Sequence, residues 1–183
     1  VEKTAKIRTH ANSLGIRIAH EIHPGTAAMC AEEFGRLVEI CDGDECLGVN
    51  ADPSHCWEGE DWETRFTHPA VRDRVYACHV KNFVVRPGVP LRRMDGDWHN
   101  RAMQFTDLGS GDLNMVRYVE MLINIGYPAR YNKIMGTDTA PLIAETESAY
   151  RDADATAIEG IQYVRDNLCF PVAEGSFEDD MGA

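Results

Sequence analysis

The 183-residue chain lacks the long apolar runs and cysteine patterns that mark membrane and secreted proteins. No apolar run approaches the roughly 18 residues that a membrane-spanning helix needs. The six cysteines form no C-x-x-C pair and no spacing typical of a disulfide framework, which indicates free thiols. The sequence therefore predicts a cytoplasmic protein with no membrane partner.

Basic residues are scarce, with 18 lysines and arginines against 30 aspartates and glutamates and a formal net charge of −12 at pH 7. Residues 39–63 contain nine acids and no base, and the acidic tail over 170–183 again has no base. Such a surface repels phosphate backbones, so no nucleic-acid partner is expected. A local surplus of acids suits a cation site, although a solvated acidic face accounts equally well for most of these residues.

Short β-rich runs alternate with amphipathic helical patterns along the chain. Strands are predicted at 16–22, 47–51, 75–81 and 142–145. Helices are predicted over 1–14 with Gly15 as the C-terminal cap, after Thr26 as an N-terminal cap, after Pro69, from about Asp112, and before Leu168. This alternation indicates a parallel sheet in an α/β fold.

The predicted faces of two helices and the nature of two long connections follow from the same pattern. The helix from about Asp112 should bury Val116, Val119 and Ile123, and the last helix should bury Ile158, Ile161, Val164 or Arg165, and Leu168. Residues 82–111 and 127–140 interrupt the alternation, and loops this long are usually functional. We interpret 82–111 as a loop or hairpin excursion at the mouth of a site.

Each predicted strand ends on a side chain that can bind a metal or transfer a proton. These residues are Glu21, Asp52, His79 and Glu145. Ligands of a parallel α/β sheet bind beyond the carboxyl ends of its strands. The period-two alternation of a strand also places all four on the face away from most of the large apolar residues, and it directs His20 and Cys78 toward the helix layer. Three carboxylates and one imidazole suit Mn²⁺, Mg²⁺, Co²⁺ or Zn²⁺.

Short sequence motifs around these residues occur in a recognisable order. They are HEIHPG around Glu21, ADPSH with Asp52 and His55, HVKN with His79 and Lys81, LGSGD at 108–112, and LIAETE with Glu145. Together, from about residue 14 to 168, they resemble the xylose isomerase-like sugar phosphate isomerase/epimerase family of (β/α)₈ TIM barrels. Because a complete barrel has eight strands and about 250 residues, residues 1–183 are expected to form the C-terminal half of one barrel domain, with about its last four βα units.

The resemblance implies a metal-dependent isomerase or epimerase of carbohydrate metabolism, acting on a sugar, a sugar phosphate or a keto-polyol. One divalent metal ion, with Mn²⁺ as the first candidate, would be held by Glu21, Asp52, His79 and Glu145. Glu21 and Glu145 would also exchange a proton on opposite faces of the substrate, through a metal-stabilised enediolate.

Four further residues are expected near the substrate. His55 would contact a substrate oxygen beside the metal, or else brace its turn. Lys81 would hold a hydroxyl or phosphate, or else neutralise the carboxylates. His23 would lie at the edge of the site or stabilise the turn, and Trp57 would form an apolar wall for a sugar.

Two alternatives remain open. Asp97 and His99 form a D-x-H pair similar to that of the endonuclease IV-type zinc-dependent apurinic endonucleases, although the spacing after His79 and the acidic surface fit that family poorly. The chain would otherwise be a truncated, non-catalytic half-barrel, whose exposed sheet edges must pair with another chain and could form a homo-oligomer.

Overall fold

The computed structural model describes residues 2–56, 60–89, 101–148 and 150–169. Four parallel strands form the main sheet in the order β1-β2-β3-β6. They are β1 (Ile18–Glu21), β2 (Leu47–Ala51), β3 (Val75–Val80) and β6 (Ile143–Ala144). All four predicted strands are therefore confirmed in their order and direction, and the last is the shortest.

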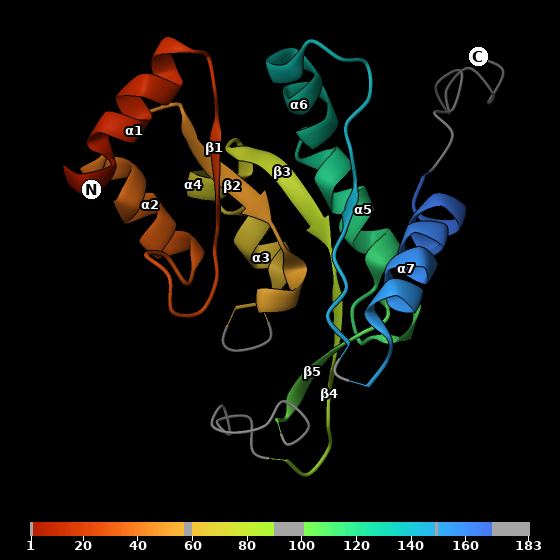
Figure 1. Ribbon diagram of the computed structural model, residues 1–183. Coiled ribbons are helices and arrows are strands. Elements are labelled where there is room, and N and C mark those ends of the chain that lie inside the picture. Colours follow the sequence, from red (N-terminus) through yellow and green to blue (C-terminus); the bar gives the residue numbers. More distant parts are fainter. Residues whose placement is uncertain (1, 57–59, 90–100, 149, 170–183) are drawn as a thin grey trace, which may run out of the picture.

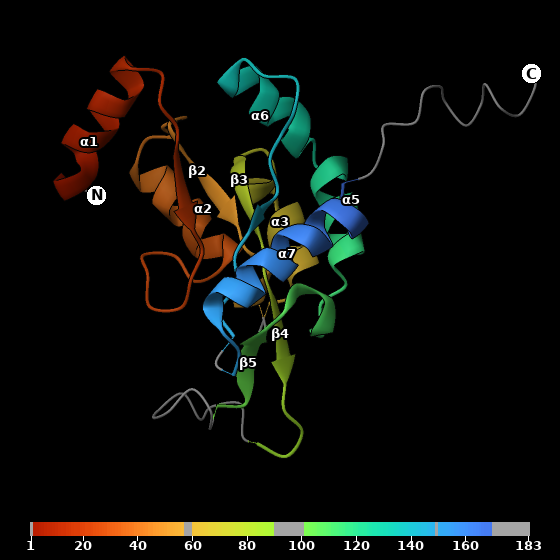
Figure 2. The same ribbon diagram turned by 45° about the vertical axis from the view of Figure 1, so that its right-hand side comes forward.

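One helix precedes the first strand and the others follow strands, and together they form the layer on one face of this sheet (Figures 1 and 2). They are α1 (Glu2–Ser13), α2 (Ala31–Ile40), α3 (Trp62–Thr67), α4 (Pro69–Arg72), α5 (Met115–Asn124), α6 (Tyr127–Met135) and α7 (Ala153–Asn167). As the sequence predicts, α1 is followed by Gly15, which has a positive φ of 69°. In the described residues no helix is both long and apolar enough to cross a membrane.

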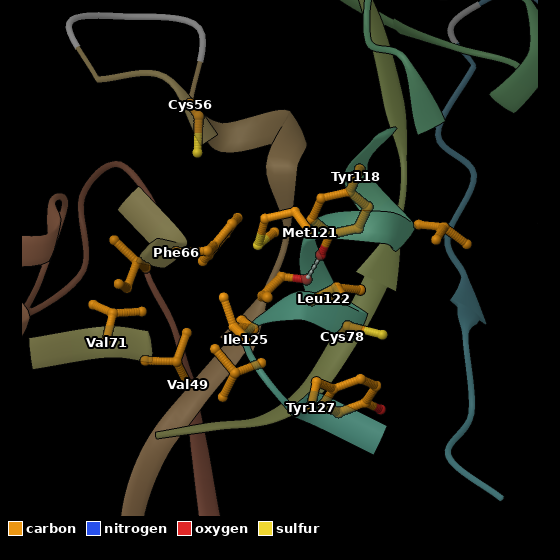
Figure 3. Packing of buried hydrophobic residues seen from close by; sticks show 14 of the residues in the cluster. Val49, Cys56, Phe66, Val71, Cys78, Tyr118, Met121, Leu122, Ile125 and Tyr127 are labelled. Carbon is orange, nitrogen blue, oxygen red and sulfur yellow. Dashed lines mark hydrogen bonds between the residues drawn. The ribbon is translucent and has the colours of Figure 1, made fainter. Parts of the chain in front are cut away.

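The main core lies between the sheet and this helix layer, as Figure 3 shows from close by. The sheet contributes Val49 of β2 and Cys78 of β3 to this core, and both are fully buried. The helices contribute Phe66 and Tyr118. The Tyr118 hydroxyl donates a 2.8 Å hydrogen bond to the carbonyl of Ala51. This bond connects α5 to the end of β2, immediately before one of the predicted site residues.

The ring of Tyr76 in β3 packs closely on Gly48 of β2. The register between these strands shifts between Val49 and Asn50, so Tyr76 lies across Gly48. A Cβ atom at Gly48 would lie 2.1 Å from Cδ2 of Tyr76. Glycine is therefore required at this position by packing, and not by an unusual φ angle.

Two predictions about helix starts and connections are wrong. Thr26 does not cap α2, which begins at Ala31; the Thr26 hydroxyl instead donates to the carbonyls of His23 and Ala28 within the turn. The predicted connection over 127–140 contains the helix α6, because Pro128 at its start needs no hydrogen bond from its nitrogen.

The buried faces of α5 and α7 also differ from the prediction. Val164 and Leu168 are buried as predicted, but Ile158 and Ile161 of α7 are 58% and 62% exposed. Gly160 instead packs toward Thr146 and toward Ala144 of β6. The absence of a side chain at Gly160 permits this close approach, which rotates the apolar isoleucines outward. In α5, Val119 is buried as expected, whereas Val116 and Ile123 are exposed in favour of Met115, Tyr118, Met121 and Leu122.

Residues following β3 form a separate two-stranded antiparallel sheet of β4 (Asn82–Val85) and β5 (Met103–Thr106). It extends beyond the carboxyl end of β3 in both views (Figures 1 and 2). Asn82 anchors it, because its side-chain amide donates to the carbonyl of Leu108 at 2.7 Å and accepts from the amide of Leu113 at 3.0 Å. The segment 90–100 lies outside the described residues, as does the acidic tail over 170–183.

Candidate metal centre

The four strand-end residues meet at one place. Each of Glu21, Asp52, His79 and Glu145 offers one potential ligand atom, and these atoms all lie within 4.8 Å of one another. Glu21 ends β1, Asp52 follows β2, His79 lies in β3 and Glu145 follows β6. The parallel strand order brings them together although they span 125 positions of the chain, from 21 to 145 inclusive.

His79 lies among the three carboxylates. Its Nδ1 atom is 2.6 Å from Glu145 Oε2, 3.4 Å from Asp52 Oδ2 and 3.7 Å from Glu21 Oε2. These distances describe a compact acidic cluster with one imidazole, which is the donor set that the strand ends predict.

Asp52 is the most deeply buried member, with a residue exposure of 2%. Its Oδ1 atom accepts hydrogen bonds from the amide and the hydroxyl of Ser54, which fixes the carboxylate at the start of the turn η1 (Pro53–His55). Its Oδ2 atom is buried and makes no hydrogen bond to any described residue. This oxygen lies 3.4 Å from His79 Nδ1 and 3.5 Å from His55 Nε2. A buried carboxylate oxygen without a hydrogen bond fits a cation ligand, because such an atom is otherwise costly to bury.

The charges in the cluster perturb one another strongly. Interactions with Asp52 and then Glu145 raise the pKa of His79 to about 10, against the opposing effect of burial. His79 in turn lowers the pKa of Glu145 to about 2, with a further contribution from Lys81. Burial acts to raise the pKa of Asp52, but the interactions with His79, His55 and Ser54 outweigh it and lower the pKa.

Glu21 is held by a second histidine. Its pKa is lowered, chiefly by hydrogen bonding to His55, whose Nε2 atom lies 2.9 Å from Glu21 Oε1. His55 is 6% exposed, and its Nε2 atom is also 3.5 Å from Asp52 Oδ2. The structure therefore places His55 beside the cluster, with the ring of His23 at 4.1 Å from its own. His23 also forms a 2.7 Å hydrogen bond between its Nδ1 atom and the carbonyl of Pro24 in the turn.

Lys81 is buried and already paired. Its Nζ atom lies 2.6 Å from Glu145 Oε1 and 3.0 Å from Glu147 Oε2, and 4.2 Å from the centre of the Phe105 ring. With a side-chain exposure of 3%, Lys81 forms ion pairs with these two carboxylates, and its contact with a substrate stays a prediction. Both hydrogen bonding to Glu145 and nearby acids raise the pKa of Lys81, although burial acts against them.

The structure adds two residues that the sequence reasoning did not include. Asn50 places its Nδ2 atom 3.4 Å from Glu21 Oε2 and 3.1 Å from His79 Nε2. Glu147 pairs with Lys81. Each lies two positions from a predicted ligand, Asp52 or Glu145, so extending the period-two alternation by one step identifies both.

Of the remaining residues singled out in the sequence, some face the helix layer and others lie outside the described residues. His20 stacks on Phe34 of α2, and Cys78 is fully buried, so both face the helix layer as predicted. Trp57 lies outside the described residues, and so does the Asp97-x-His99 pair on which the endonuclease alternative depends. All six cysteines are free thiols.

An α/β chain whose parallel strands present acids and a histidine at their carboxyl ends has the arrangement of a barrel-type active site. A family model described as xylose isomerase-like TIM barrel matches residues 1–167. The chain therefore belongs to the xylose isomerase-like TIM barrel family, which includes sugar isomerases and epimerases as well as endonuclease IV. No curated protein matches the chain significantly.

Two solved structures share this fold. A xylose isomerase domain protein from Planctomyces limnophilus is 21% identical, with a TM-score of 0.53, and the match covers 90% of this chain and 49% of that one. A xylose isomerase-like TIM barrel protein from Mycobacterium smegmatis, in complex with magnesium, is 16% identical, with a TM-score of 0.57, and the match covers 90% and 48%. The chain thus spans about half the length of the solved structures that it matches, with four parallel strands of the barrel.

Proposed function

We propose that this chain carries the metal and proton-transfer residues of a divalent-metal-dependent isomerase or epimerase that acts on a sugar or a similar keto-polyol. The observation that supports the proposal is the cluster of Glu21, Asp52, His79 and Glu145 at the carboxyl ends of four neighbouring strands. Family membership is compatible with this chemistry.

These four side chains would hold the ion. Oxygen and imidazole donors in this ratio suit Mn²⁺ best, with Mg²⁺, Co²⁺ and Zn²⁺ as the other candidates. A bound divalent cation would polarise the carbonyl and hydroxyl oxygens of a substrate and so acidify the carbon-bound proton next to the carbonyl.

The residues of the chain would move that proton. Glu21 and Glu145 come from the two outer strands of the sheet, β1 and β6, and His79 of β3 lies between them. One carboxylate would take the proton from one face of the carbon, and the other would deliver a proton on the opposite face.

Neighbouring groups keep the two carboxylates in place and ionised. His55 lies against one oxygen of Glu21, and Lys81 lies against Oε1 of Glu145 while Oε2 contacts His79. Glu145 therefore has both carboxylate oxygens engaged by cationic side chains, and Glu21 has Oε1 against His55 and Oε2 at 3.4 Å from Asn50 Nδ2. His55, His23 and Trp57 would contact the substrate, and Lys81 would act through Glu145.

Deuterium exchange at the carbon next to the carbonyl tests the proposal directly. The chain is loaded in turn with Mn²⁺, Mg²⁺, Co²⁺ and Zn²⁺ and incubated in D₂O with a panel of ketoses and keto-polyols, free and phosphorylated, and exchange is followed by proton NMR. Glu21→Gln and Glu145→Gln should each slow exchange by about 100-fold or more, because each removes a proton-transfer group.

Glu32→Gln, which removes an exposed acid in the first turn of α2, is the matched control and should exchange at the wild-type rate. Wild-type exchange rates in both site variants would contradict the proposal, and so would the absence of exchange with every metal and substrate in the panel.

A further inference from the structure

A hollow lies at the opposite end of the sheet from the metal cluster. Its volume is about 510 Å³, and it opens where the strands begin. Arg17 precedes β1, Glu45 precedes β2 and Arg74 precedes β3, while Arg130 and Lys133 come from α6. Figure 1 shows the end of α1 and the helix α6 at this end of the sheet, where the strand arrows start.

The hollow is positively charged in a protein with a net charge of −12. Its lining contains four basic side chains and two acidic ones. The bases are Arg17, Arg74, Arg130 and Lys133, and the acids are Glu45 and Asp73. Because the chain as a whole is negatively charged, a small anion will be attracted to this basic hollow in preference to other parts of the surface.

Arg74 and Arg130 are held mainly by backbone carbonyl groups. Arg74 donates to the backbone carbonyls of Gly43, Asp44 and Leu47 at 2.8–2.9 Å. Arg130 donates to backbone carbonyls at 2.9 and 3.2 Å, and its nearest carboxylate is 3.7 Å away. Carbonyl groups fix each guanidinium but leave its positive charge in place, and burial lowers the pKa of Arg130.

The other two basic residues, Arg17 and Lys133, form no ion pair with any described residue. Among the described residues, neither Arg17 nor Lys133 has a hydrogen-bond or ion-pair partner, although both line the hollow. Asp73 pairs at 3.1 Å with Arg72, which is outside the lining, and at 3.7 Å with Arg130, and Glu45 is exposed. The two acids therefore leave Arg17 and Lys133 available, and the planar donors of arginine with the point charge of lysine form a donor set that suits phosphate oxygens.

We propose that this hollow binds a phosphate group, either as inorganic phosphate or as the phosphate of a small monoester. Arg74 and Arg130 provide fixed positive charge, and Arg17 and Lys133 close onto the anion. The site is separate from the metal cluster, so phosphate binding does not depend on a bound metal.

Calorimetric titration of the full 183-residue chain tests the proposal. Inorganic phosphate and ethyl phosphate are titrated separately at constant ionic strength set with sodium chloride, with EDTA present so that no metal-bound phosphate contributes. Arg17→Gln and Lys133→Gln should each weaken phosphate binding about tenfold, because each removes charge-assisted hydrogen bonds. Neither substitution removes a contact that the fold uses, and the thermal midpoints should stay at the wild-type value.

Lys3→Gln on α1 and Arg36→Gln on α2 are matched controls, since both residues are exposed and lie away from the hollow. Their phosphate affinity should equal that of the wild type. Tighter binding of ethyl phosphate would identify a monoester as the ligand, and tighter binding of inorganic phosphate would identify the free anion. Absence of saturable binding, or equal affinity in wild type and both hollow variants, would overturn the proposal.

Discussion

Binding of Mn²⁺ to the strand-end cluster should release about one proton per ion at pH 8. Without a metal, the surrounding carboxylates raise the pKa of His79 to about 10, so about 99% of the imidazole is protonated at pH 8. A coordinating imidazole nitrogen cannot keep its proton, so binding must expel it.

The carboxylates contribute no further protons. The pKa of Glu145 is lowered to about 2, and the pKa values of Glu21 and Asp52 are also lowered, so all three are ionised at pH 8. A histidine with an ordinary pKa near 6.5 would release only about 0.03 proton at this pH. The two situations therefore differ by a factor of about 30.

Titration calorimetry in two buffers of different ionisation enthalpy measures the number of protons released. The release should be about one between pH 7 and 9 and should fall as the pH rises through about 10, where His79 loses its proton without a metal. His79→Gln replaces the imidazole by a neutral amide and should reduce both the affinity and the release. Release near zero from the wild-type protein at pH 8 would refute the assignment of His79 as a protonated ligand.

Three further outcomes follow from the structure. In the metal-free protein, the raised pKa of His79 stabilises the fold fully below pH 6.5, and this stabilisation should be lost as the pH rises through about 10, as thermal unfolding across that range would show. Tyr118→Phe should lower the unfolding free energy by about 2 kcal/mol in urea titrations, because the carbonyl of Ala51 loses its 2.8 Å partner; an unchanged value would mean that this bond contributes nothing. Gly48→Ala should cost about 3 kcal/mol, because the new Cβ would lie 2.1 Å from Tyr76 Cδ2, and wild-type stability would show that the two strands are more loosely packed than described.

Strand positions and the strand-end cluster were predictable from the sequence, because both depend on local patterns. The alternation in 47–51 defines β2 with the observed bounds, and parity along β3 separates His79 from the adjacent core residue Cys78. The parallel order of the strands then brings distant strand ends together without any knowledge of the contacts between them.

Helix faces and connections were less predictable, because they depend on tertiary packing. The apolar spacing of Ile158 and Ile161 is typical of a buried face, yet close contact at Gly160 directs α7 differently. Gly126 does end α5 as its residue type suggests, but no local signal except Pro128 shows that a second helix starts directly after it. The pairing of Lys81 with Glu147 likewise depends on β6 lying beside β3.

Metal content measured by native mass spectrometry tests the central claim most directly. The wild-type chain, after incubation with Mn²⁺ and removal of free ion, should retain one ion per chain, and Glu32→Gln should retain the same. His79→Ala and Glu145→Gln should lose it, because each removes a donor from the four-residue cluster. One ion per chain retained by both of these variants would contradict the account.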